Sequence, residues 1–192
     1  MFIGLYFGSF NPVHNGHLQI AGEMLCQVGF DELWFVVSPH NPLKQAANLA
    51  SNFDRLAMLQ LALSEVSLPI RISDVEFNLP TPSYTYKTLE VLAKSHPDDR
   101  FALIMGSDNL AVIEKWREYE HILEKYPIYF YPRKGDDAEG LVSAYGAQKV
   151  DALLLDISST QVRQMVLQSQ PIDHLVPLSV AAYIRDKGLY AE

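Results

Sequence analysis

The sequence predicts a doubly wound α/β fold, in which one parallel sheet carries helices on both faces. Short apolar runs, such as residues 33–37 and 101–105, alternate with segments of helical periodicity, and the connections between them are short. In addition, three segments rich in polar side chains each follow a predicted strand, where the ligand sites of such sheets lie. We therefore expect residues 1–192 to form a single Rossmann-like domain.

The first part of the chain predicts three strands separated by two helices. Residues 1–7 and 33–37 are apolar runs, and the second is typical of a strand buried on both faces. Residues 69–75 form a shorter strand. Helical spacing of apolar residues predicts a helix at residues 18–28 and a second one that begins after a Ser51 cap.

The second part continues the alternation. A polar turn leads into a helix at residues 84–95, and a buried strand follows at 101–105. A helical region in two pieces spans residues 110–125. The elements predicted after it are strands at 128–131 and 152–155, a modest helix within 133–148, and helices at 157–168 and 178–187, the last followed by Gly188 at its C-terminus.

Composition excludes several classes of protein. The net charge of −8 argues against a nucleic-acid partner, because affinity for a phosphate backbone comes from clustered Lys and Arg. No apolar run is long enough for a membrane span, and the N-terminus lacks the basic region of a signal peptide. The single cysteine, Cys26, falls in a helical pattern and is expected to be a small buried thiol. We therefore expect a cytosolic protein that neither binds nucleic acid nor enters a membrane.

The segment GSFNPVHNGH, residues 8–17, is the most informative part of the sequence. It follows the first predicted strand, and its two histidines, His14 and His17, lie where that strand leads into a helix. Gly8 and Gly16 allow the backbone to approach a ligand closely. The first turn of a helix offers unpaired N–H donors, so the segment predicts an anion site that can also donate protons.

Two further segments follow predicted strands at the same edge of the sheet. Gly106, Ser107 and Asp108 come after residues 101–105, and ISSTQVR, residues 157–163, comes after the last predicted strand. Taken singly, each segment is explained equally well by a turn or by helix caps. An acidic protein that binds a polyanion must also concentrate its cations locally, although any one of them is otherwise explained as a solvated surface charge. The candidate cations are Lys44, Arg55, Arg133, Lys134 and Arg163.

The pair GSFNPVHNGH and ISSTQVR resembles the signature of the nucleotidyltransferase superfamily, which shares its HxGH motif with class I aminoacyl-tRNA synthetases. Over nearly its whole length the sequence resembles the bacterial nicotinate-mononucleotide adenylyltransferases. In two places it departs from them: Asn11 stands where many members have Asp, and Leu43 where many have His. The further matches are SPHNPLK (38–44), DRLAMLQLAL (54–63), PSYTYKTL (82–89), GSDNL (106–110), Trp116, PRKG (132–135) and a Tyr-Ile pair (183–184).

This resemblance implies transfer of the adenylyl group of ATP to nicotinate mononucleotide, with release of pyrophosphate, in NAD biosynthesis. It implies that His17 donates to the α-phosphate in the transition state and that His14 supports the β- or γ-phosphate. Mg²⁺ is expected to arrive with ATP, and no protein metal site is expected. The other implied ATP contacts are Gly8, Ser9 and Phe10 through their backbone, Lys44, Gly106, Asp108 at the ribose, and Ser159, Thr160 and Arg163 at the leaving pyrophosphate.

For the second substrate, the resemblance implies that Tyr84 and Thr85 meet the nicotinate carboxylate and that Trp116 stacks on the pyridine ring. The alternatives are a sister enzyme that uses nicotinamide mononucleotide, phosphopantetheine or, with CTP, a choline- or glycerol-phosphate, and a non-catalytic nucleotide-binding module. An enzyme that acts on RNA is disfavoured by the net charge. The oligomeric state stays open, a homo-oligomer included.

Overall fold

The computed structural model describes residues 1–39, 49–133, 138–152 and 155–191. Its centre is a six-stranded sheet in the order β3-β2-β1-β4-β5-β6, with all neighbouring strands parallel. This order is that of the doubly wound dinucleotide-binding sheets, in which the direction of winding reverses between β1 and β4. The strands are β1 (Phe2–Gly8), β2 (Glu32–Val37), β3 (Ile70–Ser73), β4 (Arg100–Gly106), β5 (Ile128–Tyr131) and β6 (Gln148–Lys149).

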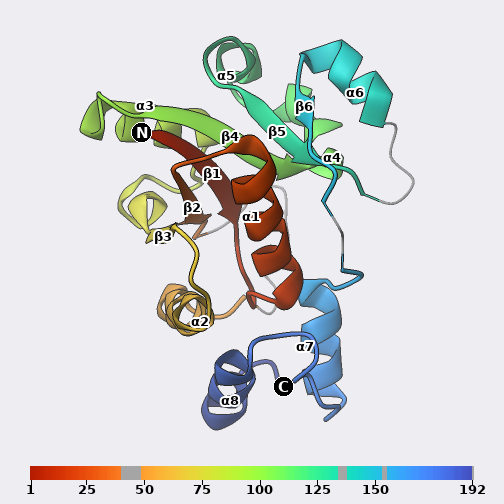
Figure 1. Ribbon diagram of the computed structural model, residues 1–192. Helices are drawn as coiled ribbons and strands as arrows, with labels where there is room; N and C mark the ends of the chain where they lie inside the picture. Colours follow the sequence, from red (N-terminus) through yellow and green to blue (C-terminus); the bar gives the residue numbers. More distant parts are fainter. Residues whose placement is uncertain (40–48, 134–137, 153–154, 192) are drawn as a thin grey trace.

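Helices pack on both faces of this sheet, which confirms the predicted fold class (Figure 1). Side chains alternate along β2: Leu33 and Phe35 join one apolar cluster, and Trp34 joins the other. The first cluster includes residues of α1, α2, α7 and α8, and the second includes residues of α3, α4 and α5. The helices are α1 (Asn15–Val28), α2 (Asn52–Ser64), η1 (Val75–Asn78), α3 (Thr85–Ser95), α4 (Ser107–Leu110), η2 (Ile113–Lys115), α5 (Tyr119–Lys125), α6 (Ala138–Tyr145), α7 (Ser159–Leu167) and α8 (Leu178–Lys187).

The sixth strand was predicted at the wrong place. The apolar run at residues 152–155 suggested a strand, but the pairing with β5 occurs at Gln148 and Lys149 and is extended by a hydrogen bond from Val150 N–H to Phe130 O of 2.8 Å. Ala152 and Leu155 lie outside any strand, and residues 153–154 lie outside the described ones. An edge strand needs few apolar side chains, and β6 is polar. The apolar run that suggested a strand lies in the segment after β6.

Cys26 is exposed, so the expectation of a buried thiol is wrong. Ile20, Ala21 and Met24 of α1 are buried in the core, and the predicted Leu18, Leu25 and Val28 pack against it. Two positions beyond Met24, a helical residue is turned by about 200° and lies on the opposite face. The apolar spacing was read correctly, but the cysteine does not belong to it.

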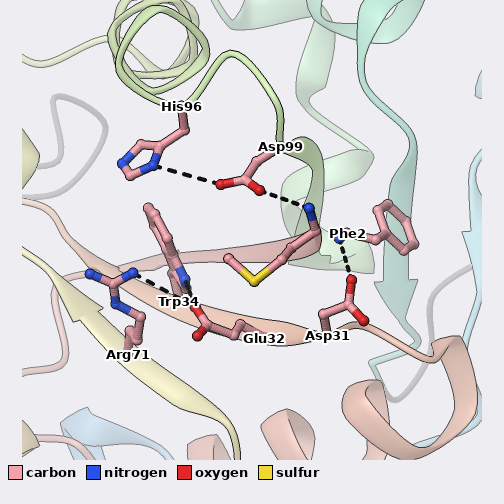
Figure 2. Close-up of polar contacts among 8 residues, drawn as sticks. Phe2, Asp31, Glu32, Trp34, Arg71, His96 and Asp99 are labelled. Carbon is pink, nitrogen blue, oxygen red and sulfur yellow. Dashed lines mark hydrogen bonds and ion pairs between the residues drawn. The ribbon is translucent and has the colours of Figure 1, made fainter.

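The amino ends of the strands carry a network of polar contacts (Figure 2). Asp99 accepts a hydrogen bond of 2.7 Å from the amino group of Met1 and lies 3.6 Å from His96 Nδ1, while Asp31 accepts the Phe2 N–H at 2.6 Å. All these residues lie at the start of β1 or just before β2 and β4, because the strands are parallel. Polar contacts therefore hold the amino ends of the strands together. The segments that the sequence analysis singled out lie at the opposite, carboxyl ends.

Among the described residues, the helices are too short or too polar to span a membrane.

Candidate functional site

A cavity of about 600 Å³ lies at the carboxyl ends of β1 and β4, where the winding of the sheet reverses. Its volume is typical of small-molecule sites. Lys44 and Lys134 lie outside the described residues. The predicted site residues that line the cavity are Gly8, Ser9, Phe10, His14, His17, Tyr84, Thr85, Gly106, Asp108, Trp116, Ser159, Thr160 and Arg163.

The loop between β1 and α1 has its carbonyl oxygens bound by side chains from distant elements. Arg55 Nη1 of α2 donates to Ser9 O at 2.7 Å, and Arg163 Nη1 of α7 donates to Asn11 O at 2.7 Å. The Ser159 hydroxyl donates to Pro12 O at 2.9 Å. Carbonyl oxygens repel phosphate, and here three of them are engaged by protein donors. The loop is therefore prepared to receive an anion.

Arg55 is fully buried, which contradicts its interpretation as a cation available to phosphate. Its guanidinium donates five hydrogen bonds, as many as it has N–H groups. The acceptors are oxygens of the segments that surround the cavity loop rather than carboxylates. Arg55 therefore fastens these segments to α2. The five acceptors are the carbonyl oxygens of Ser9, Ser38, Pro39 and Ala50 and the side-chain oxygen of Asn52, at 2.6 to 3.2 Å.

His14 and His17 form a stacked pair at the start of α1, with ring centroids 3.7 Å apart. The His14 N–H donates to His17 Nδ1 at 3.2 Å, which assigns the proton of a neutral His17 to Nε2 and makes that atom a donor. Burial, and next the charge of Arg133, lowers the pKa of His14 to about 4. His14 is therefore neutral near pH 7. Its Nδ1 is buried and has no hydrogen-bond partner among the described residues.

The two glycines of this segment make room for neighbouring side chains. A Cβ at Gly8 would lie 2.8 Å from the Phe10 ring, and one at Gly16 would lie 3.0 Å from His14 Nδ1. Both distances are shorter than ordinary carbon contacts. The glycines thus permit Phe10 and His14 to fold back against the loop, a reason that the sequence pattern alone did not reveal.

The N-terminus of α7 reaches the same cavity. Ser158 caps the helix, because its hydroxyl oxygen accepts the Gln161 N–H at 3.1 Å. One turn further, Arg163 bonds Thr160 Oγ1 at 3.3 Å as well as the loop carbonyl. Ser159, Thr160 and Arg163 therefore lie beside the histidine loop at a helix end that favours anions.

Asp108, in the first turn of α4 just after β4, is paired with Arg133. Arg133 Nε lies 3.0 Å from Asp108 Oδ1, and about half of each side chain is exposed. The Arg133 N–H also donates to Ser107 Oγ at 2.7 Å, which anchors the loop after β5 to α4. An exposed pair of this kind contributes little stability, and a carboxylate keeps further acceptor sites, so Asp108 can still receive hydroxyl donors.

At the other end of the cavity lie aromatic side chains. Tyr84 precedes α3, and the Arg117 guanidinium lies 4.5 Å from its ring centroid. Trp116 follows η2 rather than lying in a helix, and its Nε1 is buried without a partner among the described residues. Beside them Glu76 is buried and accepts hydroxyl hydrogen bonds from Ser83 at 2.9 Å and Thr88 at 2.8 Å.

Sequence reasoning missed several residues that line the cavity. Glu76 is a lone acid in a turn, and nothing in the pattern marks it. Tyr6 alternates inward on β1 like any core residue, and its hydroxyl lies 3.1 Å from that of Tyr131. Arg117 could have been noticed as a cation next to the predicted Trp116.

Comparison with known proteins identifies the family of this chain. The family model for cytidylyltransferase-like proteins matches residues 5–165. A probable nicotinate-nucleotide adenylyltransferase of Flavobacterium johnsoniae is 45% identical over 192 residues, with 99% of each chain covered. One from Cytophaga hutchinsonii is 41% identical and covers 100% of this chain and 99% of that protein.

Solved structures show the same fold. The nicotinic acid mononucleotide adenylyltransferase of Plasmodium falciparum, complexed with NaAD, superimposes with a TM-score of 0.85 at 21% identity, covering 98% of this chain and 97% of that one. This likeness concerns the fold, whereas the sequence relatives and the matching family model identify the family. The chain belongs to the cytidylyltransferase-like family and, within it, to the nicotinate-nucleotide adenylyltransferases.

Proposed function

We propose that this protein transfers the adenylyl group of ATP to nicotinate mononucleotide, giving nicotinate adenine dinucleotide and pyrophosphate in NAD biosynthesis. The observation that carries the proposal is that the stacked histidines, the N-terminus of α7 and Trp116 all line one and the same cavity. Relatives at 35–45% identity that carry the name of this activity support it. The test is pyrophosphate release from ATP with each candidate acceptor in turn, nicotinamide mononucleotide included.

The reaction needs positioning more than it needs a protein nucleophile. A phosphate oxygen of the mononucleotide attacks the α-phosphorus of ATP, a new P–O bond forms, and the bond to the bridging oxygen of pyrophosphate breaks. Two anions must therefore be held together while charge develops on the leaving group. The protein meets this need with hydrogen-bond donors fixed before the substrates bind.

In this proposal each predicted side chain has one role. The Nε2–H of His17 donates to the α-phosphate, and neutral His14 supports the β- or γ-phosphate by hydrogen bonding rather than by charge. Asp108 accepts the ribose hydroxyls of the adenosine. Gly106 contacts ATP as well. The remaining phosphate contacts come from the backbone of Gly8, Ser9 and Phe10, from Lys44, and from Ser159, Thr160 and Arg163, which hold the leaving pyrophosphate.

The family uses ATP, and a divalent metal generally accompanies that substrate. Within the described residues no group of three His, Cys, Asp or Glu side chains could hold a metal. We propose that Mg²⁺ arrives with ATP and is held chiefly by the phosphates of ATP and by water. When bound, the ion would neutralise part of the phosphate charge. The protein would hold it indirectly, through the residues that bind the phosphates.

The acceptor end suits a nicotinate ring. Trp116 offers a face for stacking, and backbone N–H groups at Tyr84 and Thr85 begin α3. Charge-assisted hydrogen bonds to a carboxylate are about twice as strong as neutral ones. An amide in the same place would point an NH₂ group at these donors and leave groups unpaired, at roughly 1–3 kcal/mol each.

We therefore expect the enzyme to prefer nicotinate mononucleotide over nicotinamide mononucleotide by a factor on the order of a hundred or more in kcat/KM. Steady-state kinetics with both acceptors measures this ratio. Trp116→Ala should slow both reactions and leave the ratio nearly unchanged, because stacking does not depend on the carboxylate. Comparable efficiency with the two mononucleotides would contradict the proposal and indicate a dual-specificity sister enzyme.

Arg163→Ala should weaken ATP binding and lower kcat, because it removes a guanidinium from the phosphate end of the cavity. Arg163→Lys should restore only part of the loss, since an ammonium cannot bond the Asn11 carbonyl, Thr160 and a phosphate with one planar fork. Calorimetry with ATP and the rate of pyrophosphate release measure both effects. Unchanged ATP affinity and rate in Arg163→Ala would show that Arg163 takes no part in binding ATP.

A further inference from the structure

The C-terminal segment after α8 contacts the loop that receives the phosphates. The Tyr190 hydroxyl donates to Asn11 Oδ1 at 2.7 Å, across 179 positions of sequence. Tyr190 lies outside residues 5–165, which the family model covers. The same amide oxygen of Asn11 accepts the Ala50 N–H at 3.0 Å. Asn11 therefore joins three segments of the chain: the loop, the start of α2 and the C-terminal segment.

Asn11 is also bonded to the cation that the proposed function places at pyrophosphate. Its carbonyl oxygen accepts from Arg163 Nη1 at 2.7 Å, while its side chain is held by Tyr190. The Asn11 side chain is nearly fully buried, so water does not readily replace a lost partner. A displaced Asn11 would therefore shift the Arg163 guanidinium and the loop carbonyls together.

The backbone of Tyr190 is strained where it makes this contact. Its φ of 63° lies in the left-handed region, which bulky residues rarely adopt. Such conformations persist where surrounding contacts over-determine them. Burial raises the pKa of Tyr190, so the hydroxyl stays protonated and acts as the donor to Asn11. The ring thus serves as a fixed support at this point.

We infer that Tyr190 is a positioning residue for ATP: through Asn11 it holds Arg163 and the phosphate loop in the arrangement that receives the triphosphate. This inference rests on the proposed function. It assigns to the last part of the chain a role in substrate binding that no motif in the sequence indicated.

The test compares two hydroxyl deletions in the same C-terminal region. Tyr190→Phe should weaken the binding of a non-hydrolysable ATP analogue and lower kcat/KM for ATP by about three- to tenfold, the effect of one hydrogen bond, and leave KM for the acceptor unchanged. Tyr183→Phe is the matched control, because the Tyr183 hydroxyl donates to Asp54 on α2 at 2.9 Å instead of to Asn11. The control should bind the analogue as the wild type does.

A double mutant tests whether the effect passes through Asn11. In the Asn11→Ala background, Tyr190→Phe should cause no further loss of ATP affinity, because the acceptor is already gone. Additive losses would overturn the inference, and so would equal weakening in Tyr190→Phe and Tyr183→Phe, or no weakening in Tyr190→Phe. Binding of the ATP analogue does not require nicotinate mononucleotide. Failure of the enzyme to turn over nicotinate mononucleotide would therefore overturn the proposed function and leave the binding result for Tyr190 unaffected.

Discussion

Replacing His17 with alanine should lower turnover by about two to three orders of magnitude, the loss that follows removal of one transition-state donor. His17 lies in the first turn of α1, and its Nδ1 accepts the His14 N–H, which leaves the proton on Nε2. The variant should still fold, because the His17 side chain is only partly buried, although it loses the stacking on His14 and the hydrogen bond from the His14 N–H. Pyrophosphate release measures the rate, and circular dichroism measures the fold.

His96→Ala is the matched control for this experiment. His96 lies at the opposite edge of the sheet, 3.6 Å from Asp99, and about a third of its side chain is exposed (Figure 2). Its loss should leave turnover at the wild-type value. A His17→Ala protein with an unchanged spectrum and near-normal turnover would contradict the assignment of His17 as the donor.

Replacing Arg55 with methionine should destabilise the protein by about 3 kcal/mol or more, because five oxygen acceptors around a fully buried side chain lose their donor at once. Turnover should fall with stability, since the Ser9 carbonyl would no longer be held away from the phosphates. Arg55→Lys should restore part of the stability, because an ammonium has three donors where the guanidinium has five. Denaturant unfolding at equilibrium gives the free energies.

Arg71→Met provides the comparison on the surface. Arg71 lies on β3, more than half of its side chain is exposed, and its nearest carboxylate oxygen, on Glu32, is 3.8 Å away. A substitution of this kind changes the free energy of unfolding by no more than about 0.5 kcal/mol. If Arg55→Met and Arg71→Met had similar unfolding free energies, the buried guanidinium would not be the fastener that its contacts indicate.

Most of the fold was predictable because the buried elements carry their pattern locally. The strand at residues 128–131 was predicted with the bounds it has, and Gly188 ends α8 with a φ of 61°, as its position predicted. The errors arose where tertiary context decides. The edge strand β6 has a polar sequence, and Cys26 lies two positions beyond the buried Met24, on the exposed face of α1.

The candidate site was predictable where its residues follow strands. Gly8 and Gly106 end β1 and β4, as expected, and both line the cavity. Ser159 lines it too, although the strand expected directly before it is absent from the described residues. The supports of that cavity were not predictable. Arg55 was interpreted as a surface cation. The contact between Asn11 and Tyr190 joins residues 179 positions apart, so no local sequence pattern predicts it.

The long reach of that contact has a consequence for how the protein is made. A ribosome builds the phosphate loop within the first residues of the chain and the tyrosine that holds it 179 positions later than Asn11. The hydrogen bond between Asn11 and Tyr190 cannot form before Tyr190 has been synthesised, and closing so long a loop costs entropy before a bond is gained. The arrangement that we propose for ATP binding is therefore completed late in synthesis. Affinity for ATP then reports that the C-terminal segment has been synthesised and has reached its place.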